Sequence, residues 1–220
     1  MLFRCDEDKF LTFKILSSVI VPRPIAWVVT LDTIGQVNAA PFSYFNLFST
    51  DPATICIGVN GRDDGGQKDT ARNLVCSGEM VVNLVTAALV SDMNLTAADF
   101  PSSVSEVEIA GIGLEASTDV APPRISQSPV ALECRVTHTL QIGRADQIFV
   151  GEVIAVHICD DLIEPGGGID FARLDLVGRV NGSGRYVRLR DVFEVPRVDA
   201  VKATELAIGQ RQGRREPEDS

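Results

Sequence analysis

The sequence has few histidines and no paired cysteines. It contains only two histidines, His138 and His157, and its five cysteines are scattered singly without a C-x-x-C pair. Because there is no paired Cys/His cluster and no H-E-x-x-H motif, we expect no dedicated metal site. An odd number of isolated cysteines also argues against a disulfide framework and favours a cytoplasmic location.

Long apolar runs and positive charge are scarce as well. No apolar run approaches the roughly 18–20 residues that a membrane-spanning helix needs, and the acidic N-terminus MLFRCDEDKF lacks the character of a secretory signal. The formal net charge is −10, and a surface of this sign repels nucleic-acid phosphates. We therefore expect neither a membrane span nor a nucleic-acid partner.

Short apolar and β-branched segments dominate what is present. Such patterns predict strands at residues 25–31, 53–59, 80–85, 130–142 and 148–158. The last two are joined by the turn GRADQ and predict a hairpin.

Helical patterns are fewer and shorter. They cover residues 69–77, with Asp69 or Thr70 as the expected N-cap and Gly78 just past the end, and residues 86–98. Because the strands do not alternate regularly with long helices, a doubly wound parallel sheet is disfavoured. We expect a mainly β fold, an antiparallel barrel with a few short peripheral helices.

We expect one domain over residues 1–198. From residue 199 the chain becomes charged and loses its periodicity. This composition predicts a C-terminal tail over residues 199–220 that is helical or disordered.

The stretch GRDDGGQKDTARNL, residues 61–74, joins a glycine-rich loop to a predicted helix. A P-loop would place Lys directly after its last glycine, but Gln67 stands there, so a P-loop is disfavoured. Flexible glycines, a helix N-terminus and the side chains of Lys68 and Thr70 are still typical of an anion site. From these residues alone, a solvated loop followed by a capped helix remains the alternative.

Three motifs occur in a fixed order along the chain: PRPIAW at 22–27, NAAPFSYFN at 38–46 and KDTARN at 68–73. Together they resemble the flavin reductase-like family, also called the flavoredoxin family. Its members are FMN-binding, antiparallel Greek-key split β-barrels. The resemblance covers roughly residues 10–190, so it implies this fold for most of the chain and FMN as the cofactor.

The resemblance implies cofactor contacts from eight residues: Arg23, Ser43, Tyr44, Phe45, Asn46, Lys68, Asp69 and Thr70. The segment matching APFSYFN would lie along the flavin ring and ribityl chain. Ser43 and Asn46 would then be hydrogen-bond partners, and the backbone around Tyr44 and Phe45 would run beside the ring.

The segment Lys68-Asp69-Thr70 would take the FMN phosphate through Lys68, Thr70 and the helix N-terminus. Arg23 would add a further contact to the phosphate or the ribityl chain. Asp63 and Asp64 depart from this pattern, because they would repel the phosphate unless they point away.

The aromatic residues near these motifs have two readings. Phe42, Phe45 and Phe48 recur at a spacing of three, and Trp27 lies on a predicted strand. Each is suited either to the hydrophobic core or to a wall beside the flavin ring.

The resemblance implies an NAD(P)H-dependent flavin reductase or a closely related FMN oxidoreductase. The flavin carries out the hydride and electron chemistry, so no catalytic acid or base is named. The alternatives are an FMN-holding electron carrier that takes electrons from a protein donor without its own nicotinamide site, and a split barrel that has lost its flavin and serves as a scaffold.

We also expect a homodimer with the flavin near the interface. The family resemblance implies it, and the predicted strands carry more apolar faces than one barrel interior needs. The surplus must be covered by helices or by another subunit.

Overall fold

The structure is a computed structural model that describes residues 2–98, 100–101, 104–182 and 184–204. The chain divides into two units, Met1–Arg190 and Asp191–Ser220, and each is described by itself. In the second unit residues 200–204 are helical, and the rest of the predicted tail, residues 205–220, lies outside the described residues.

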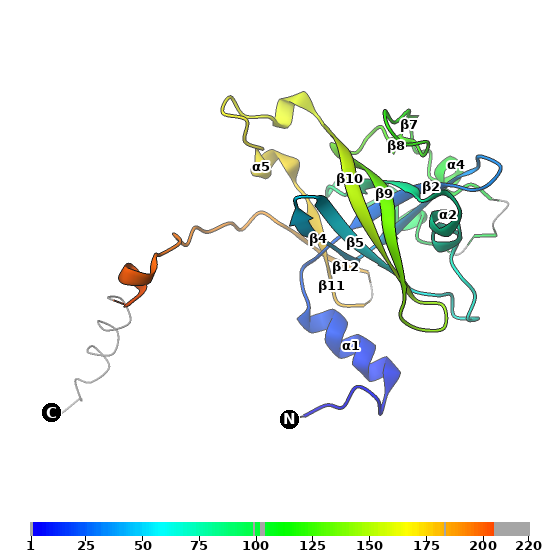
Figure 1. The fold of residues 1–220 in the computed structure, drawn as a ribbon, viewed down its shortest axis with the longest axis horizontal. Coiled ribbons are helices and arrows are strands. Elements are labelled where there is room, and N and C mark those ends of the chain that lie inside the picture. The colour runs from blue at the N-terminus through cyan, green and yellow to red at the C-terminus, as the bar shows by residue number, and fades with distance from the viewer. Residues whose placement is uncertain (1, 99, 102–103, 183, 205–220) are drawn as a thin grey trace. The chain divides into compact units, whose positions relative to one another are not determined.

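The first unit is built on a seven-stranded antiparallel sheet with the order β3-β2-β6-β9-β10-β5-β4 (Figure 1). Its strands are β2 (Ala26–Leu31), β3 (Val37–Phe42), β4 (Tyr44–Thr50), β5 (Ala53–Val59), β6 (Glu79–Leu84), β9 (Val130–Gln141) and β10 (Gln147–Ile158). The expectation of a mainly β, antiparallel split barrel is confirmed.

The remaining elements are short. A second sheet pairs β1 (Arg23–Pro24), β11 (Val177–Val180) and β12 (Arg185–Arg188), and a third pairs β7 (Leu114–Glu115) with β8 (Arg124–Ile125). The helices are α1 (Lys9–Val19), α2 (Asp69–Ser77), α3 (Val90–Leu95), α4 (Glu106–Ile109), the 3-10 turn η1 (Asp160–Leu162) and α5 (Phe171–Leu174).

The two edges of the large sheet come from one continuous stretch of chain. β3 lies at one edge and β4 at the other, yet only Ser43 separates them in sequence. The sheet must therefore curl until its edges approach each other at Ser43. They do not pair, and this opening is the split of the barrel.

The core lies on both faces of β2. Ala26 and Val28 point into the barrel, where they pack with side chains such as Phe149. Trp27 and Val29 point to the opposite face, which Met93 of α3 and residues of the following segment cover. A strand buried on both faces reads as a continuous apolar run, as AWVVTL does.

The helices differ most from the sequence-based expectation. α1 was not anticipated, although Asp8 caps it by accepting hydrogen bonds from the backbone of Phe10 and Leu11. The helix predicted at 86–98 is restricted to Val90–Leu95.

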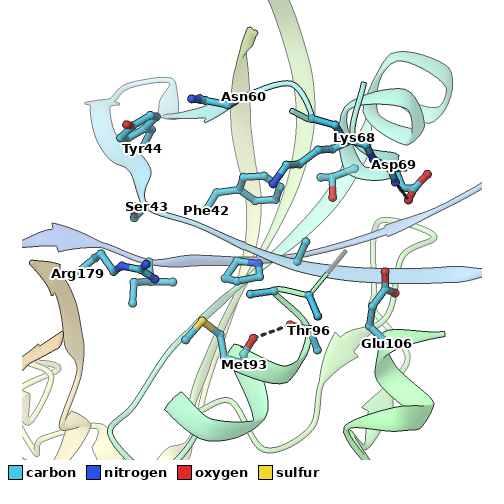
Figure 2. A pocket seen from close by; sticks show the side chains of 18 of the residues that line it. Phe42, Ser43, Tyr44, Asn60, Lys68, Asp69, Met93, Thr96, Glu106 and Arg179 are labelled. Carbon is cyan, nitrogen blue, oxygen red and sulfur yellow. Dashed lines mark hydrogen bonds and ion pairs between the residues drawn. The ribbon is translucent and has the colours of Figure 1, made fainter. Parts of the chain in front are cut away.

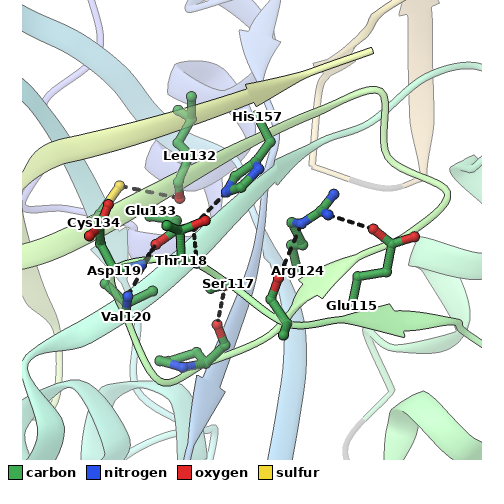
Figure 3. A network of polar contacts seen from close by, with 12 residues as sticks. Glu115, Ser117, Thr118, Asp119, Val120, Arg124, Leu132, Glu133, Cys134 and His157 are labelled. Carbon is green, nitrogen blue, oxygen red and sulfur yellow. Dashed lines mark hydrogen bonds and ion pairs between the residues drawn. The ribbon is translucent and has the colours of Figure 1, made fainter. Parts of the chain in front are cut away.

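A buried carboxylate anchors the loop before β8. Glu133 of β9 is fully buried, and it accepts hydrogen bonds from the backbone N–H groups of Thr118, Asp119 and Val120 at 2.7, 2.6 and 3.1 Å (Figure 3). The Nε2 atom of His157 on β10 lies 2.5 Å from its Oε1. Burial alone would raise the pKa of Glu133, but these hydrogen bonds outweigh burial and hold its pKa below the usual 4.5.

We expect Glu133→Gln to lower the free energy of unfolding by about 3 kcal/mol at neutral pH, because the amide leaves buried donors without a charged acceptor. A lowered pKa in the folded state means that the carboxylate stabilises the fold above its ordinary pKa. This contribution is lost as pH falls through the folded-state pKa. The difference in the free energy of unfolding between the parent protein and Glu133→Gln should therefore disappear at acidic pH.

Urea denaturation across a pH series measures this gap. The matched control is Glu115→Gln, since Glu115 is about half exposed and pairs with Arg124 at the surface. Equal stability of Glu133→Gln and the parent at neutral pH would contradict the expectation.

Candidate functional site

A cavity of about 310 Å³ opens at the split of the barrel (Figure 2). Its walls come from β3 and the Ser43 bend, the start of α2, the α3–α4 segment, and the β11–β12 hairpin together with α1. A volume of this size is within the range of small-molecule sites in proteins.

One end of the cavity is the N-terminus of α2. Lys68 is the N-cap, with Asp69 and Thr70 in the first turn, so the prediction that Asp69 or Thr70 forms the cap was wrong. No side chain in the described part of the chain caps the helix, which leaves its first backbone N–H groups available to a ligand. The predicted end is confirmed, because Gly78 adopts the left-handed conformation at the C-cap.

Lys68 adds positive charge at this helix terminus. Within the described part of the chain, no carboxylate forms an ion pair with its ammonium group. An unpaired cation beside open backbone N–H groups is suited to an anion.

A buried polar network positions α2 against the sheet. The side-chain amide of Asn38 on β3 donates to Thr70 Oγ1 at 2.9 Å and, more weakly, to Thr30 Oγ1 at 3.4 Å. The amide of Asn73 on α2 also donates to Thr30 Oγ1, at 3.1 Å. Because all four side chains are buried, these bonds fix where the helix starts relative to β3.

The acidic residues near this end carry little free negative charge toward the cavity. Asp69 pairs with Arg62 at 2.7 Å and with Arg72. Asp63 and Asp64 are exposed and lie outside the cavity wall. Asp63 and Asp64 therefore do not line the space where the sequence analysis expected them to repel a phosphate.

Glu106 of α4 also lines the cavity on this side (Figure 2). Burial raises the pKa of its carboxyl group, and the nearby charge of Asp69 adds to the rise.

The middle of the cavity has an apolar wall. Ala40, Pro41 and Phe42 of β3 line it, with Met93 of α3 facing them across the opening. Trp27, in contrast, is fully buried, and its indole N–H donates to Thr96 Oγ1 at 2.9 Å. Of the two readings for Trp27, the structure supports the core.

Phe45 and Phe48, the remaining aromatic residues near the motifs, do not line the cavity. Phe45 is half-buried and packs against the barrel core, whereas Phe48 is 67% exposed and belongs to neither the core nor the cavity.

The opposite end of the cavity holds Arg23. Its guanidinium donates to the carbonyl oxygens of Ser17 and Ile20 at the end of α1, and of Asn181 in the β11–β12 turn. Its Nε makes a longer contact of 3.4 Å with Ser43 Oγ. Arg23 thus joins α1, the hairpin and the Ser43 bend.

The structure brings together six of the eight residues expected at a cofactor site: Arg23, Ser43, Tyr44, Lys68, Asp69 and Thr70. Phe45 and Asn46 do not line the cavity. Asn46 is exposed, and its Oδ1 accepts the backbone N–H of Leu47.

Sequence reasoning missed Glu106 and Arg179, which also line the cavity. Glu106 lies outside every strand, helix and motif expected from the sequence. Arg179 lies on β11 of the β11–β12 hairpin and lines the cavity, whereas Arg185 on the facing strand is exposed.

Known proteins are similar to this chain in fold and in sequence. The model of the flavin reductase like domain matches residues 17–173. An uncharacterized protein of Deinococcus radiodurans is 41% identical over 192 residues, which cover 84% of each chain. Nitrilotriacetate monooxygenase component B from Bacillus cereus superposes with a TM-score of 0.84 at 30% identity, covering 89% of this chain and 98% of that one.

The 2-nitrobenzoate 2-nitroreductase of Pseudomonas fluorescens superposes with a TM-score of 0.82 at 28% identity, covering 91% of this chain and 96% of that one. The fold, with a cavity at its opening, is therefore that of a flavin reductase-like split barrel. The chain belongs to the flavin reductase-like family.

Two negative findings apply to the described residues. None of their helices is long and apolar enough to cross a membrane. No group of three or more His, Cys, Asp or Glu side chains among them could hold a metal ion.

Proposed function

We propose that the protein binds FMN in this cavity and transfers electrons from NAD(P)H through it. The observation that carries the proposal is that one cavity is lined by an uncapped helix N-terminus, by Lys68, which has no ion-pair partner among the described residues, and by an apolar wall along β3. FMN has a phosphate, a polar ribityl chain and a flat ring; the phosphate would lie at the helix N-terminus and the ring along the apolar wall.

The residues of this chain would bind and orient the cofactor. Lys68, Thr70 and the first N–H groups of α2 would hold the phosphate, with Asp69 keeping Arg62 and Arg72 in place. When bound, the flavin supplies the hydride and electron chemistry.

The ring would lie along Ala40–Tyr44, where Ser43 offers a hydroxyl group. Arg23 would contribute through its charge and by holding Ser43. Phe45 would support the bend from the core side. Asn46, which lies outside the cavity wall, stays a predicted contact.

The comparisons support the oxidoreductase part of the proposal. Two neighbours with 30% and 28% identity carry the names of a monooxygenase component and a nitroreductase. Both names describe redox proteins, and both chains align over nearly their whole length.

Lys68→Ala should weaken FMN binding about tenfold or more, because a charge-assisted hydrogen bond contributes about 1.5–3 kcal/mol. Riboflavin, which lacks the phosphate, should bind both proteins almost equally. Quenching of flavin fluorescence during titration measures both affinities.

Lys14→Ala is the matched control, since Lys14 is an exposed lysine of α1 that does not line the cavity. Equal losses for FMN and riboflavin would place Lys68 away from the phosphate. A parent protein that ignores FMN would overturn the cofactor assignment itself.

The alternative function is an FMN-holding electron carrier without a nicotinamide site. To distinguish the reductase from the electron carrier, NADH or NADPH is added to the flavin-loaded protein without oxygen. The flavin absorbance at about 450 nm is followed. Bleaching is expected for the reductase. A flavin that stays oxidised with both nucleotides, yet is reduced by dithionite, would favour the carrier.

We also propose a homodimer with the flavin near the interface. Leu47 and Phe48 on the edge strand β4 are 58% and 67% exposed, and Tyr44, on the same strand, lines the cavity. An open edge strand with exposed apolar side chains is a surface that proteins commonly cover.

Light scattering should report about twice 23.7 kDa at low micromolar concentration. A monomer that keeps its flavin on dilution would contradict a site completed by two chains.

For the location we propose the cytoplasm. All five cysteines are free thiols, and three of them, Cys5, Cys76 and Cys159, are exposed. A reducing compartment keeps such thiols from oxidising.

A further inference from the structure

The cavity end opposite Lys68 has a positive charge that no acidic side chain among the described residues balances through an ion pair. Arg179 of β11 and Arg23 both line it, and Figure 2 shows Arg179 well apart from Lys68 and Asp69. Within residues 2–98, 100–101, 104–182 and 184–204, neither guanidinium forms an ion pair with a carboxylate. By contrast Arg62, at the Lys68 end, is paired with Asp69.

Arg179 is held rigidly in this position. Its Nη1 donates to the hydroxyl of Tyr186 at 2.7 Å, and its Nη2 donates to the carbonyl of Gly182 at 3.2 Å. The guanidinium also lies 5.0 Å from the centre of the Tyr186 ring. These two hydrogen bonds use two of the five N–H donors of the guanidinium, and the other three have no hydrogen-bond partner among the described residues.

The two arginines are close enough to affect each other. Burial lowers the pKa of Arg23, and the charge of Arg179 lowers it further, while the Tyr44 hydroxyl acts in the opposite direction. Two like charges in a partly buried place repel each other, and an anion bound between them relieves the repulsion.

An aromatic side chain borders this end. Phe13 of α1 lines the cavity and packs closely on the hairpin, since a Cβ atom at Gly182 would lie 2.6 Å from its ring. A ligand here therefore meets a flat apolar surface beside a planar cation.

We propose that Arg179 is the centre of a second anion subsite, which binds the carboxylate or phosphate group of a planar organic co-substrate. The proposal rests on the proposed function, in which the flavin phosphate occupies the Lys68 end. A single phosphate does not occupy both ends of the cavity, so the anion at Arg179 belongs to the molecule that exchanges electrons with the flavin.

Three probes of similar shape test this subsite: benzoate, phenyl phosphate and the neutral benzamide. Each is titrated calorimetrically into the flavin-loaded protein. Benzoate, phenyl phosphate or both should bind about tenfold more tightly than benzamide, as charge-assisted hydrogen bonds to a guanidinium predict. Which anion binds tighter distinguishes a carboxylate ligand from a phosphate ligand.

Arg179→Gln should abolish the preference for anions, and Arg179→Lys should restore part of it. The matched control is Arg185→Gln on the same hairpin, because Arg185 is exposed and lies outside the cavity wall. This control should keep the parent's preference. Thermal melting of each variant verifies folding, and Arg179→Lys decides the outcome if Arg179→Gln does not fold.

Three results would overturn the proposal. The first is a parent protein that binds benzamide as tightly as both anions. The second is an anion preference that survives in Arg179→Gln. If Arg179→Gln does not fold, the corresponding result is an anion preference in Arg179→Lys that equals that of the parent protein. The third is an Arg179 variant that loses FMN affinity but not riboflavin affinity, which would assign the flavin phosphate to this end.

Failure of the proposed function gives a different pattern. If the purified protein takes up no flavin, it is titrated with the same three probes in its flavin-free form. An anion preference that depends on Arg179 would then support the subsite while the FMN assignment fails. If this flavin-free protein shows no anion preference, both the subsite and the FMN assignment are overturned.

Discussion

The continuity of β3 and β4 is the constraint on which the rest of the structure depends. One stretch of chain forms both edges of a seven-stranded sheet and turns between them at Ser43. The sheet must curl to satisfy this connection, and the edges meet without pairing. The cavity lies at that unpaired opening, with Ala40–Tyr44 as one wall. The fold therefore creates the site, because closure of the barrel at this point would fill the space that a ligand needs.

The charges in the cavity follow from the elements that close this opening. α2 reaches the opening with its N-terminus, held there by the buried network around Asn38 and Thr70. The β11–β12 hairpin reaches the other end and carries Arg179. The apolar wall between them is continuous with the core on both faces of the sheet. A ligand that spans the cavity thus meets a cation at each end and a flat surface in the middle.

Local patterns were sufficient to predict much of the fold. The strands at 53–59, 130–142 and 148–158 agree with β5, β9 and β10 to within one residue, because alternation and β-branching report directly on a pleated surface. The helix at 69–77 and its Gly78 cap were also predicted. α1 was not, since much of its apolar surface is exposed and only Ser17 is buried, so its pattern does not describe a face packed on the core.

Order and local chemistry in the sequence determined the family and the antiparallel split barrel, and they led to the phosphate contacts proposed for Lys68 and Thr70, because each of these depends on residues near one another in the chain. Tertiary structure alone decided which further side chains join the expected ones in the cavity and which expected ones lie outside it. Arg179 joins the site through strand pairing and hairpin geometry, Glu106 joins it through the packing of α4, and Asn46 leaves it by lying on an exposed edge strand. Contacts between residues more than a hundred positions apart, such as that of Arg23 with Asn181, have no local signature in a single sequence, because they depend on how the whole sheet curls.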